Sequence, residues 1–207
     1  VPKFRIADKG INVVAIIDDA YFGLFFDDAC MKQSIFTKLA GKHERLLAIK
    51  ADAATKEVYV WGLRVGFVSI AVKSAKDPKP LYEAINSKFG GCIRAVISNC
   101  SSLSQKLILQ ALSCPSFYQE REQKVAKMKE RALKVHEVLS NPKYDDAWTP
   151  YPFNSGYFMC LKLKKVDAEK LRVYLLDKYG VGTISITPTN LRIAFSCLET
   201  NEIQDLF

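Results

Sequence analysis

The chain has 207 residues, enough for one large domain or two small ones with a real apolar core. Hydrophobic residues make up 49% of it and charged residues 25%, which is ordinary globular composition. No apolar run approaches the length that spans a bilayer, and the net charge of +8 is spread over segments that also carry Asp and Glu, so we expect neither a membrane nor a nucleic-acid partner.

The cysteines and histidines predict no metal site. Six cysteines are scattered along the chain without a C-x-x-C pair, and there are only two histidines. This pattern argues against zinc and against a disulfide scaffold. It indicates that most of the cysteines are small buried hydrophobic residues in a reducing compartment, and the first residues have no signal-peptide pattern. We therefore expect a cytoplasmic protein.

The first part of the chain, residues 1–116, predicts an α/β domain. The β-branched run from Asn12 to Ile17 predicts a strand buried on both faces, as in a mainly parallel sheet. Leu46 to Lys50 and Gly66 to Val72 predict two further short buried strands. A helix is expected to begin at Pro78, and the pair Gly90-Gly91 indicates a turn. Residues 102–112 predict an apolar helix.

The second part, residues 117–207, predicts a smaller α+β domain that begins with a long charged helix. That helix runs from Phe117 to Leu139, where it carries one narrow apolar stripe, and Asn141-Pro142 ends it. Gly156 to Leu163 and Asn190 to Cys197 predict two strands. Between them a helix is expected over Asp167 to Tyr179, closed by Gly180.

Asp18 and Tyr21 lie where the first predicted strand ends. A carboxylate at the C-terminal end of a parallel strand lies where α/β sheets bind ligands, and there it can pair with a protonated ring nitrogen. Tyr21, three residues on, can contact an oxygen of the same ring. The alternative is that Asp18 or Asp19 caps the next helix, and the residues alone leave both interpretations open.

Lys56 and Arg64 lie eight residues apart in the segment T-K-E-V-Y-V-W-G-L-R-V-G-F. The apolar and glycine neighbours of Arg64 predict a partly buried guanidinium, which needs an anionic partner. With Asp18, the pair supplies what pyridoxal phosphate needs: an amine, an acid for the ring nitrogen and a cation for the phosphate. Taken singly, a surface lysine and a structural ion pair are the alternatives.

Arg192 lies in the middle of the apolar run N-L-R-I-A-F-S. An arginine in such a strand is costly unless its guanidinium binds an anion at two points, and the α-carboxylate of an amino acid is a suitable partner. The alternative is an arginine on an edge strand that reaches solvent.

These segments, with D-D-A-Y-F-G-L-F near the start, resemble the fold type I pyridoxal-phosphate aminotransferases of class I/II, the group that includes aspartate aminotransferase. The resemblance covers nearly the whole chain. It implies a homodimeric enzyme that moves an amino group between amino-acid and 2-oxo-acid substrates, with pyridoxal 5′-phosphate as cofactor.

The resemblance also implies a role for each matching residue. Lys56 is similar to the lysine that forms the Schiff base with the cofactor and moves the Cα proton. By the same resemblance, Asp18 pairs with the pyridinium nitrogen, and Tyr21 donates to the 3-oxygen of the ring. Arg64 is then the phosphate ligand, and Arg192 binds the substrate α-carboxylate.

Arg94, in I-R-A-V-I-S-N, is similar in place to an arginine that in aspartate aminotransferases reaches the neighbouring subunit and binds the side-chain carboxylate. The chain departs from the family pattern at Cys100-Ser101, where prolines are common, and at Ala53, where many members carry a phosphate-binding serine. Both departures affect the details of binding.

Family members are roughly twice as long as this chain. The resemblance therefore implies a C-terminal half: the end of the cofactor-binding large domain followed by most of the small domain. The 207 residues by themselves are expected to be inactive. Two alternatives stay open, a lyase or decarboxylase on the same fold and a non-catalytic regulatory domain, because fold does not fix reaction.

Overall fold

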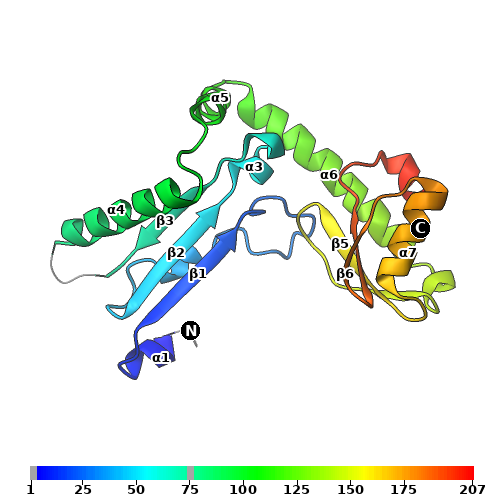
Figure 1. The fold of residues 1–207 in the computed structure, drawn as a ribbon, viewed down its shortest axis with the longest axis horizontal. Coiled ribbons are helices and arrows are strands. Elements are labelled where there is room, and N and C mark those ends of the chain that lie inside the picture. Colours follow the sequence, from blue (N-terminus) through cyan, green and yellow to red (C-terminus); the bar gives the residue numbers. More distant parts are fainter. Residues whose placement is uncertain (1–3, 74–76) are drawn as a thin grey trace. The chain divides into compact units, whose positions relative to one another are not determined.

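The structure is a computed structural model that describes residues 4–73 and 77–207 (Figure 1). The chain folds into two compact units. The first comprises the residues up to Gly23 together with Met31–Phe117, and the second comprises Leu24–Cys30 and Tyr118–Phe207. The short segment Leu24–Cys30 thus interrupts the first unit and packs with the second. Among the described helices, none is both long and apolar enough to cross a membrane.

The first unit is built on a three-stranded sheet in the order β1-β2-β3 (Figure 1). β1 (Val13–Asp19) and β2 (Leu46–Asp52) are parallel, whereas β3 (Phe67–Ala71) is antiparallel to β2. The connection from β2 to β3 is made of α3 (Ala54–Glu57) and the 3-10 helix η1 (Trp61–Leu63). Because a parallel return needs a longer crossover, this short connection yields an antiparallel pair.

The first unit also contains four α-helices outside the sheet and the β2–β3 connection, counted over its described residues. They are α1 (Phe4–Asp8), α2 (Phe36–Leu39), α4 (Lys79–Val96) and α5 (Ser102–Leu112). The helix predicted over residues 102–112 is confirmed, with Ser101 as its N-cap. The turn predicted at Gly90-Gly91 is wrong, because both glycines lie inside α4. Each glycine costs about 1 kcal/mol relative to alanine in a helix, which a long amphipathic helix tolerates.

The sheet of the first unit is covered on one face. There Ile17, Leu39, Leu46 and Ala48 form a buried cluster between the sheet and α2. On the other face the side chains of Val14 and Ile16 are 59% and 73% exposed. The prediction of strands buried on both faces is therefore wrong for β1, because an apolar run indicates surface suited to burial while the described elements cover one side.

The second unit contains a four-stranded antiparallel sheet in the order β4-β5-β7-β6. Its elements are α6 (Phe117–Leu139), η2 (Pro142–Tyr144), β4 (Trp148–Pro150), β5 (Phe158–Leu163), α7 (Ala168–Tyr179), β6 (Ile184–Thr187), β7 (Asn190–Ala194), η3 (Thr200–Glu202) and α8 (Ile203–Leu206). The predicted α6, β5, α7 and β7 are present, whereas β4, β6 and α8 were not predicted from sequence.

Local signals explain the well-predicted helices of the second unit. The Asp167 carboxylate accepts hydrogen bonds from the backbone N–H groups of Glu169 and Lys170, both at 3.0 Å, which caps the start of α7. Gly180 closes that helix with φ of 68°. In α6 the apolar stripe is buried through Met128, Ala132, Val135 and Leu139.

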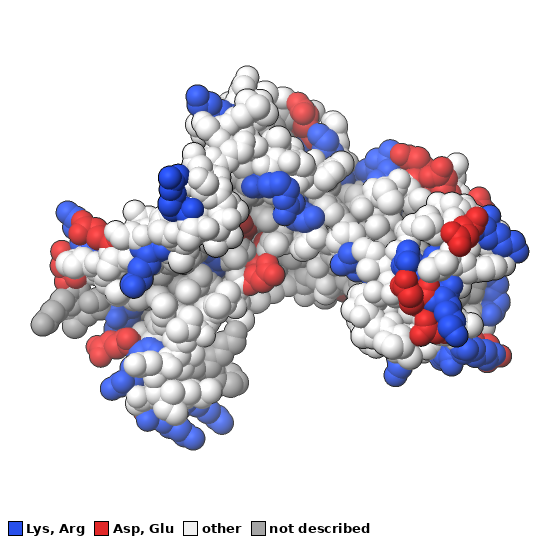
Figure 2. Space-filling model, viewed as in Figure 1, with Lys and Arg blue, Asp and Glu red and all other residues white. Residues whose placement is uncertain are grey.

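The charges are mixed on the surface. On the face drawn in Figure 2, acidic and basic side chains are interspersed with uncharged surface. This distribution is typical of solvated helix faces and does not form a stripe of one sign on that face.

Gly66 lies where the chain enters β3 beside the end of β2. A Cβ atom at this position would lie 2.7 Å from the backbone carbonyl oxygen of Asp52, well inside van der Waals contact. The two backbones approach so closely that a side chain at residue 66 requires one of them to shift.

We therefore expect Gly66→Ala to lower the free energy of unfolding by about 1–3 kcal/mol, the usual cost of overpacking. Urea unfolding followed by circular dichroism measures it. Gly62→Ala in the same connection is the matched control, since a Cβ there meets no atom within 4 Å. Equal losses for the two substitutions would contradict the steric explanation.

Candidate active site

A buried threonine closes the loop that carries Lys56. Thr55 is 3% exposed, and its Oγ1 both donates to the carbonyl oxygen of Val65 and accepts from the N–H of Val65, each at 2.9 Å. The backbone N–H of Thr55 donates to the same carbonyl at 3.1 Å. These bonds tie together the two residues that flank Lys56 and Arg64, although the sequence separates Thr55 from Val65 by ten positions.

Lys56 and Tyr21 are brought together within the first unit. The Nζ atom of Lys56 lies 5.5 Å from the centroid of the Tyr21 ring. Lys56 belongs to α3, which follows β2, and Tyr21 belongs to the turn that follows β1. Because β1 and β2 are parallel neighbours, both residues leave the sheet at its same end.

Arg64 has the left-handed backbone conformation, with φ of 52° and ψ of 51°. Its side chain is exposed, and its Nη1 donates to the carbonyl oxygen of Trp61 at 3.2 Å. The prediction that the Arg64 guanidinium is partly buried is therefore wrong. The left-handed residue turns the chain out of η1, so apolar neighbours in sequence do not enclose the arginine.

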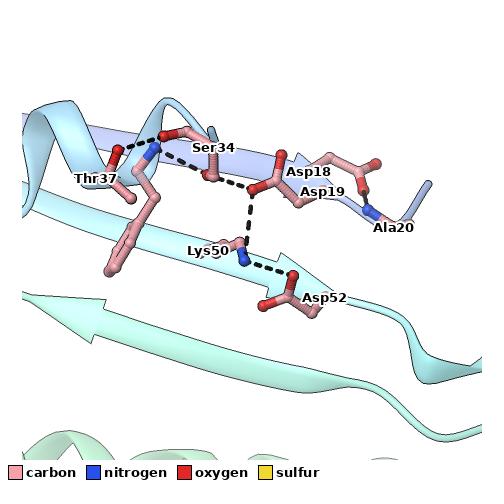
Figure 3. Close-up of polar contacts among 8 residues, drawn as sticks. Asp18, Asp19, Ala20, Ser34, Thr37, Lys50 and Asp52 are labelled. Carbon is pink, nitrogen blue, oxygen red and sulfur yellow. Dashed lines mark hydrogen bonds and ion pairs between the residues drawn. The ribbon is translucent and has the colours of Figure 1, made fainter. Parts of the chain in front are cut away.

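Asp18 and Asp19 end β1 with their side chains on opposite faces of the sheet (Figure 3). The Asp18 carboxylate is exposed and accepts from the N–H of Ala20 at 3.1 Å. Turns follow Ala20 rather than a helix, so the helix-cap interpretation is wrong for Asp18. Asp18 is thus left available to a ligand at the end of the strand.

Asp19 instead joins a polar network on the face that α2 covers (Figure 3). Ser34 donates through Oγ to the Asp19 carboxylate, and Lys50 lies between Asp19 and Asp52. The Nζ of Lys50 is 2.7 Å from Asp52 Oδ1 and 3.8 Å from Asp19 Oδ2. No local sequence motif indicates this network, because its contacts join two strands and the segment before α2.

Arg94 lies near the end of α4, and its Nη1 donates to the hydroxyl oxygen of Ser98 at 3.0 Å. Ser98 has a positive φ of 64°, which ends the helix by turning the chain. The side chain of Arg94 is exposed, so its guanidinium is accessible to an anion.

Arg192 belongs to the second unit, in the strand β7 between β5 and β6. The edge-strand alternative is therefore wrong. Leu191 and Ile193 point into the core, so Arg192 lies on the opposite face, where its Cζ is 4.6 Å from the centroid of the Phe158 ring. Phe158 was missed in the sequence because the register of two separate strands creates the contact.

Cys160 is the direct cross-strand neighbour of Arg192. It is half-buried and four of the other cysteines are exposed, so the prediction that most cysteines are buried is wrong. Burial raises the pKa of the Cys160 thiol, and the positive guanidinium of Arg192 acts in the opposite direction. The thiol therefore stays protonated at neutral pH and contributes an uncharged surface beside the arginine.

The loop that follows β7 is fixed to α6 by charge-assisted hydrogen bonds. Arg131 donates to the carbonyl oxygen of Ser196 at 2.5 Å and to the carboxylate of Glu199 at 3.0 Å. Lys127 lies 2.9 Å from the same carboxylate. The hydrogen bond to Lys127, with the charge of Arg131 assisting, holds the pKa of Glu199 below its usual range.

Comparison with known proteins identifies the family. The sequence profile described as aminotransferase class I and II matches residues 4–207. The chain belongs to the class I and II aminotransferases. A search of curated protein sequences found no significant match.

Solved aminotransferase structures share the fold. An aminotransferase from Anaerococcus prevotii is 20% identical, with a TM-score of 0.73 over 99% of this chain and 48% of its own. α-Aminoadipate aminotransferase from Thermus thermophilus, complexed with N-(5′-phosphopyridoxyl)-L-leucine, is 21% identical. Its TM-score is 0.69 over 97% of this chain and 49% of its own. Aspartate aminotransferase from Thermotoga maritima is 20% identical, with a TM-score of 0.68 over 99% of this chain and 50% of its own. The chain spans about half the length of these structures.

Pyridoxal phosphate is the cofactor of the aminotransferase family, and the residues of the first unit fit it. Lys56 offers an amine beside the Tyr21 phenol ring, and Asp18 offers an exposed carboxylate at the end of the parallel strand. Arg64 offers an exposed guanidinium at the far side of the loop that Thr55 closes. These are the amine, acid and cation that the cofactor requires.

The Thr55 bridge generates a prediction. Thr55→Val keeps the shape of the side chain but removes the hydroxyl that bonds both backbone groups of Val65. We expect it to lower the free energy of unfolding by about 1–3 kcal/mol and to speed hydrogen exchange of the Val65 amide. Thr149→Val, at an exposed position of β4, is the control and should change neither measurement. An unchanged Val65 exchange rate would refute the bridging role.

The Glu199 cluster predicts a pH dependence. Because the folded-state pKa of Glu199 is lowered, its pairing stabilises the fold above the unfolded-state pKa and is lost as pH falls through the folded value. Carbon NMR titration of the side-chain carboxyl group measures that pKa directly. Lys127→Met removes the largest cause and should move the titration midpoint up towards 4.5. No movement would show that Lys127 does not set this pKa.

Proposed function

We propose that this chain supplies the lysine and most of the other protein ligands of a pyridoxal-phosphate-dependent aminotransferase. The observation that carries the proposal is the loop closed by Thr55, which presents Lys56 5.5 Å from the Tyr21 ring at the shared end of β1 and β2. A surface lysine needs no such loop, because an exposed amine is stabilised by water alone.

When bound, pyridoxal phosphate supplies an aldehyde and an electron-withdrawing ring. Lys56 would provide the amine that holds the cofactor through this aldehyde, and it would move the proton at the substrate Cα atom. Asp18 holds the proton on the ring nitrogen, and Tyr21 donates a hydrogen bond to the ring oxygen. Arg64 binds the phosphate group, with exposed surface that suits a doubly charged ligand.

Two arginines are proposed to bind the substrate. Arg192, with one face of its guanidinium on Phe158, keeps its N–H groups for the α-carboxylate and so orients the Cα–H bond. Arg94, exposed near the end of α4, is proposed to bind the side-chain carboxylate of an aspartate-like amino acid. The 2-oxo-acid product has the same carboxylates and binds the same groups.

The complete enzyme is proposed to be a cytoplasmic homodimer, with Arg94 serving the neighbouring subunit. The chain covers about half of the matched aminotransferase structures, and the face of β1 next to Asp18 exposes Val14 and Ile16. Both observations support the proposal that the 207 residues alone do not transaminate.

Covalent labelling tests the proposed role of Lys56. We expect pyridoxal 5′-phosphate followed by borohydride to label Lys56 in preference to the other lysines, as measured by peptide mass spectrometry. Lys56→Ala should remove the cofactor chromophore in the visible absorbance spectrum. Lys38→Ala, which changes an exposed lysine of α2, is the control and should keep it. Retention of the chromophore in Lys56→Ala would exclude Lys56 from the role.

The reaction type is tested in the complete enzyme. Aspartate and alanine are offered as amino donors to 2-oxoglutarate, and glutamate formation is measured. Stoichiometric transfer with preference for aspartate is expected. Release of ammonia or carbon dioxide without transfer would favour a lyase or decarboxylase, and transamination by the 207 residues alone would contradict their proposed inactivity.

A further inference from the structure

The network around Lys50 places three charged side chains on the sheet face that also carries the buried apolar cluster (Figure 3). The side chains of Lys50 and Asp52 are each 20% exposed, and that of Asp19 is 10% exposed. Partial burial of three charges costs desolvation free energy, and apolar side chains would cover α2 without that cost. Sheet packing alone therefore does not explain this set of residues.

The position of the network links it to the active-site loops. Asp19 and Asp52 are paired at the last rung of the β1–β2 ladder. Tyr21 follows Asp19 by two residues, and Lys56 follows Asp52 by four. Lys50, bonded to Asp52 and close to Asp19, thus joins the two strands at the point where the backbone ladder stops.

A serine extends the same tie to a third segment. Ser34 is 6% exposed, donates to the Asp19 carboxylate and accepts from the backbone N–H of Phe36 at 3.0 Å. Asp19 is therefore held from two sides, by the Ser34 hydroxyl and by the Lys50 ammonium. Without Lys50, the carboxylates of Asp19 and Asp52 would face each other across the last rung with no cation between them.

We propose that Lys50 is a positioning residue that clamps the ends of β1 and β2 and thereby sets the placement of Lys56 beside Tyr21. The clamp acts on the opposite face from Asp18, the residue proposed to pair with the cofactor ring. The effect of the clamp on the reactivity of Lys56 rests on the proposed function. The clamp itself can be measured without cofactor.

The test compares Lys50→Met, Lys50→Arg and Lys79→Met in the full 207-residue chain. Lys79 is the matched control, since its side chain is 76% exposed on α4 and Lys79→Met makes the same charge change. Hydrogen exchange is read at the amides of Phe22 and Lys56, which donate to the carbonyl oxygens of Asp19 and Ala53. The Val13 amide, bonded to the Arg45 carbonyl at the other end of β1, is the internal reference.

We expect Lys50→Met to accelerate exchange at Phe22 and Lys56 about tenfold relative to Val13, and Lys79→Met to leave the ratio unchanged. Labelling of Lys56 by pyridoxal 5′-phosphate and borohydride should fall by a similar factor in Lys50→Met. Lys50→Arg keeps the charge. It should therefore bring the exchange ratio and the labelling of Lys56 most of the way back to the values of the unsubstituted chain. If Lys50→Met does not fold, Ser34→Ala removes one hold on Asp19 and should give a smaller change in the same direction.

The outcomes separate the clamp from the proposed function. An unchanged exchange ratio in Lys50→Met overturns the clamp, and accelerated exchange with unchanged Lys56 labelling overturns its effect on the lysine. Equal acceleration at Val13 means that Lys50 only stabilises the unit, which also overturns the proposal. If the unsubstituted chain shows no preferred labelling of Lys56, the proposed function fails, while the exchange ratio still decides whether Lys50 positions the two loops.

Discussion

The buried hydroxyl of Thr55 is the contact on which the candidate active site of the first unit depends. By bonding both backbone groups of Val65, it folds the connection between β2 and β3 into a closed loop. Lys56 and Arg64 then leave that loop next to its two tied residues. The positions of the amine and the cation are thus set by the backbone geometry of the closed loop.

The parallel pairing of β1 and β2 adds the second constraint. Each residue of β1 from Val13 to Asp19 faces a residue of β2 from Leu46 to Asp52 without a bulge. The loops that follow the two strands therefore start from the same level, and alternation divides the final residues between faces: Asp18 lies on the exposed face, Asp19 on the face towards α2. The short β2–β3 connection, which contains no long crossover helix, carries the proposed ligand-binding residues Lys56 and Arg64.

Sequence predicted what local chemistry controls. α5, α6 and α7 were predicted almost to the residue, because caps and a steady apolar period define them. The sequence predicted an ordered set of site residues, Lys56, Asp18, Tyr21 and Arg64, which stays a prediction. The predicted burial of Arg64 was wrong, because its neighbours in sequence do not indicate a left-handed backbone turn. Lys50, Ser34 and Phe158 were missed, since their partners lie in other strands or segments and only the register brings them together.

The left-handed backbone of Arg64 favours glycine at this position, whereas the proposed phosphate contact needs the guanidinium of arginine. For a residue with a Cβ atom this conformation costs about 1–2 kcal/mol of conformational free energy, whereas glycine adopts it without that cost. A library selected for thermal tolerance alone would therefore enrich glycine at residue 64 and discard the guanidinium with it. Engineering for higher thermal stability therefore has to keep arginine at residue 64 and select stabilising substitutions at other positions.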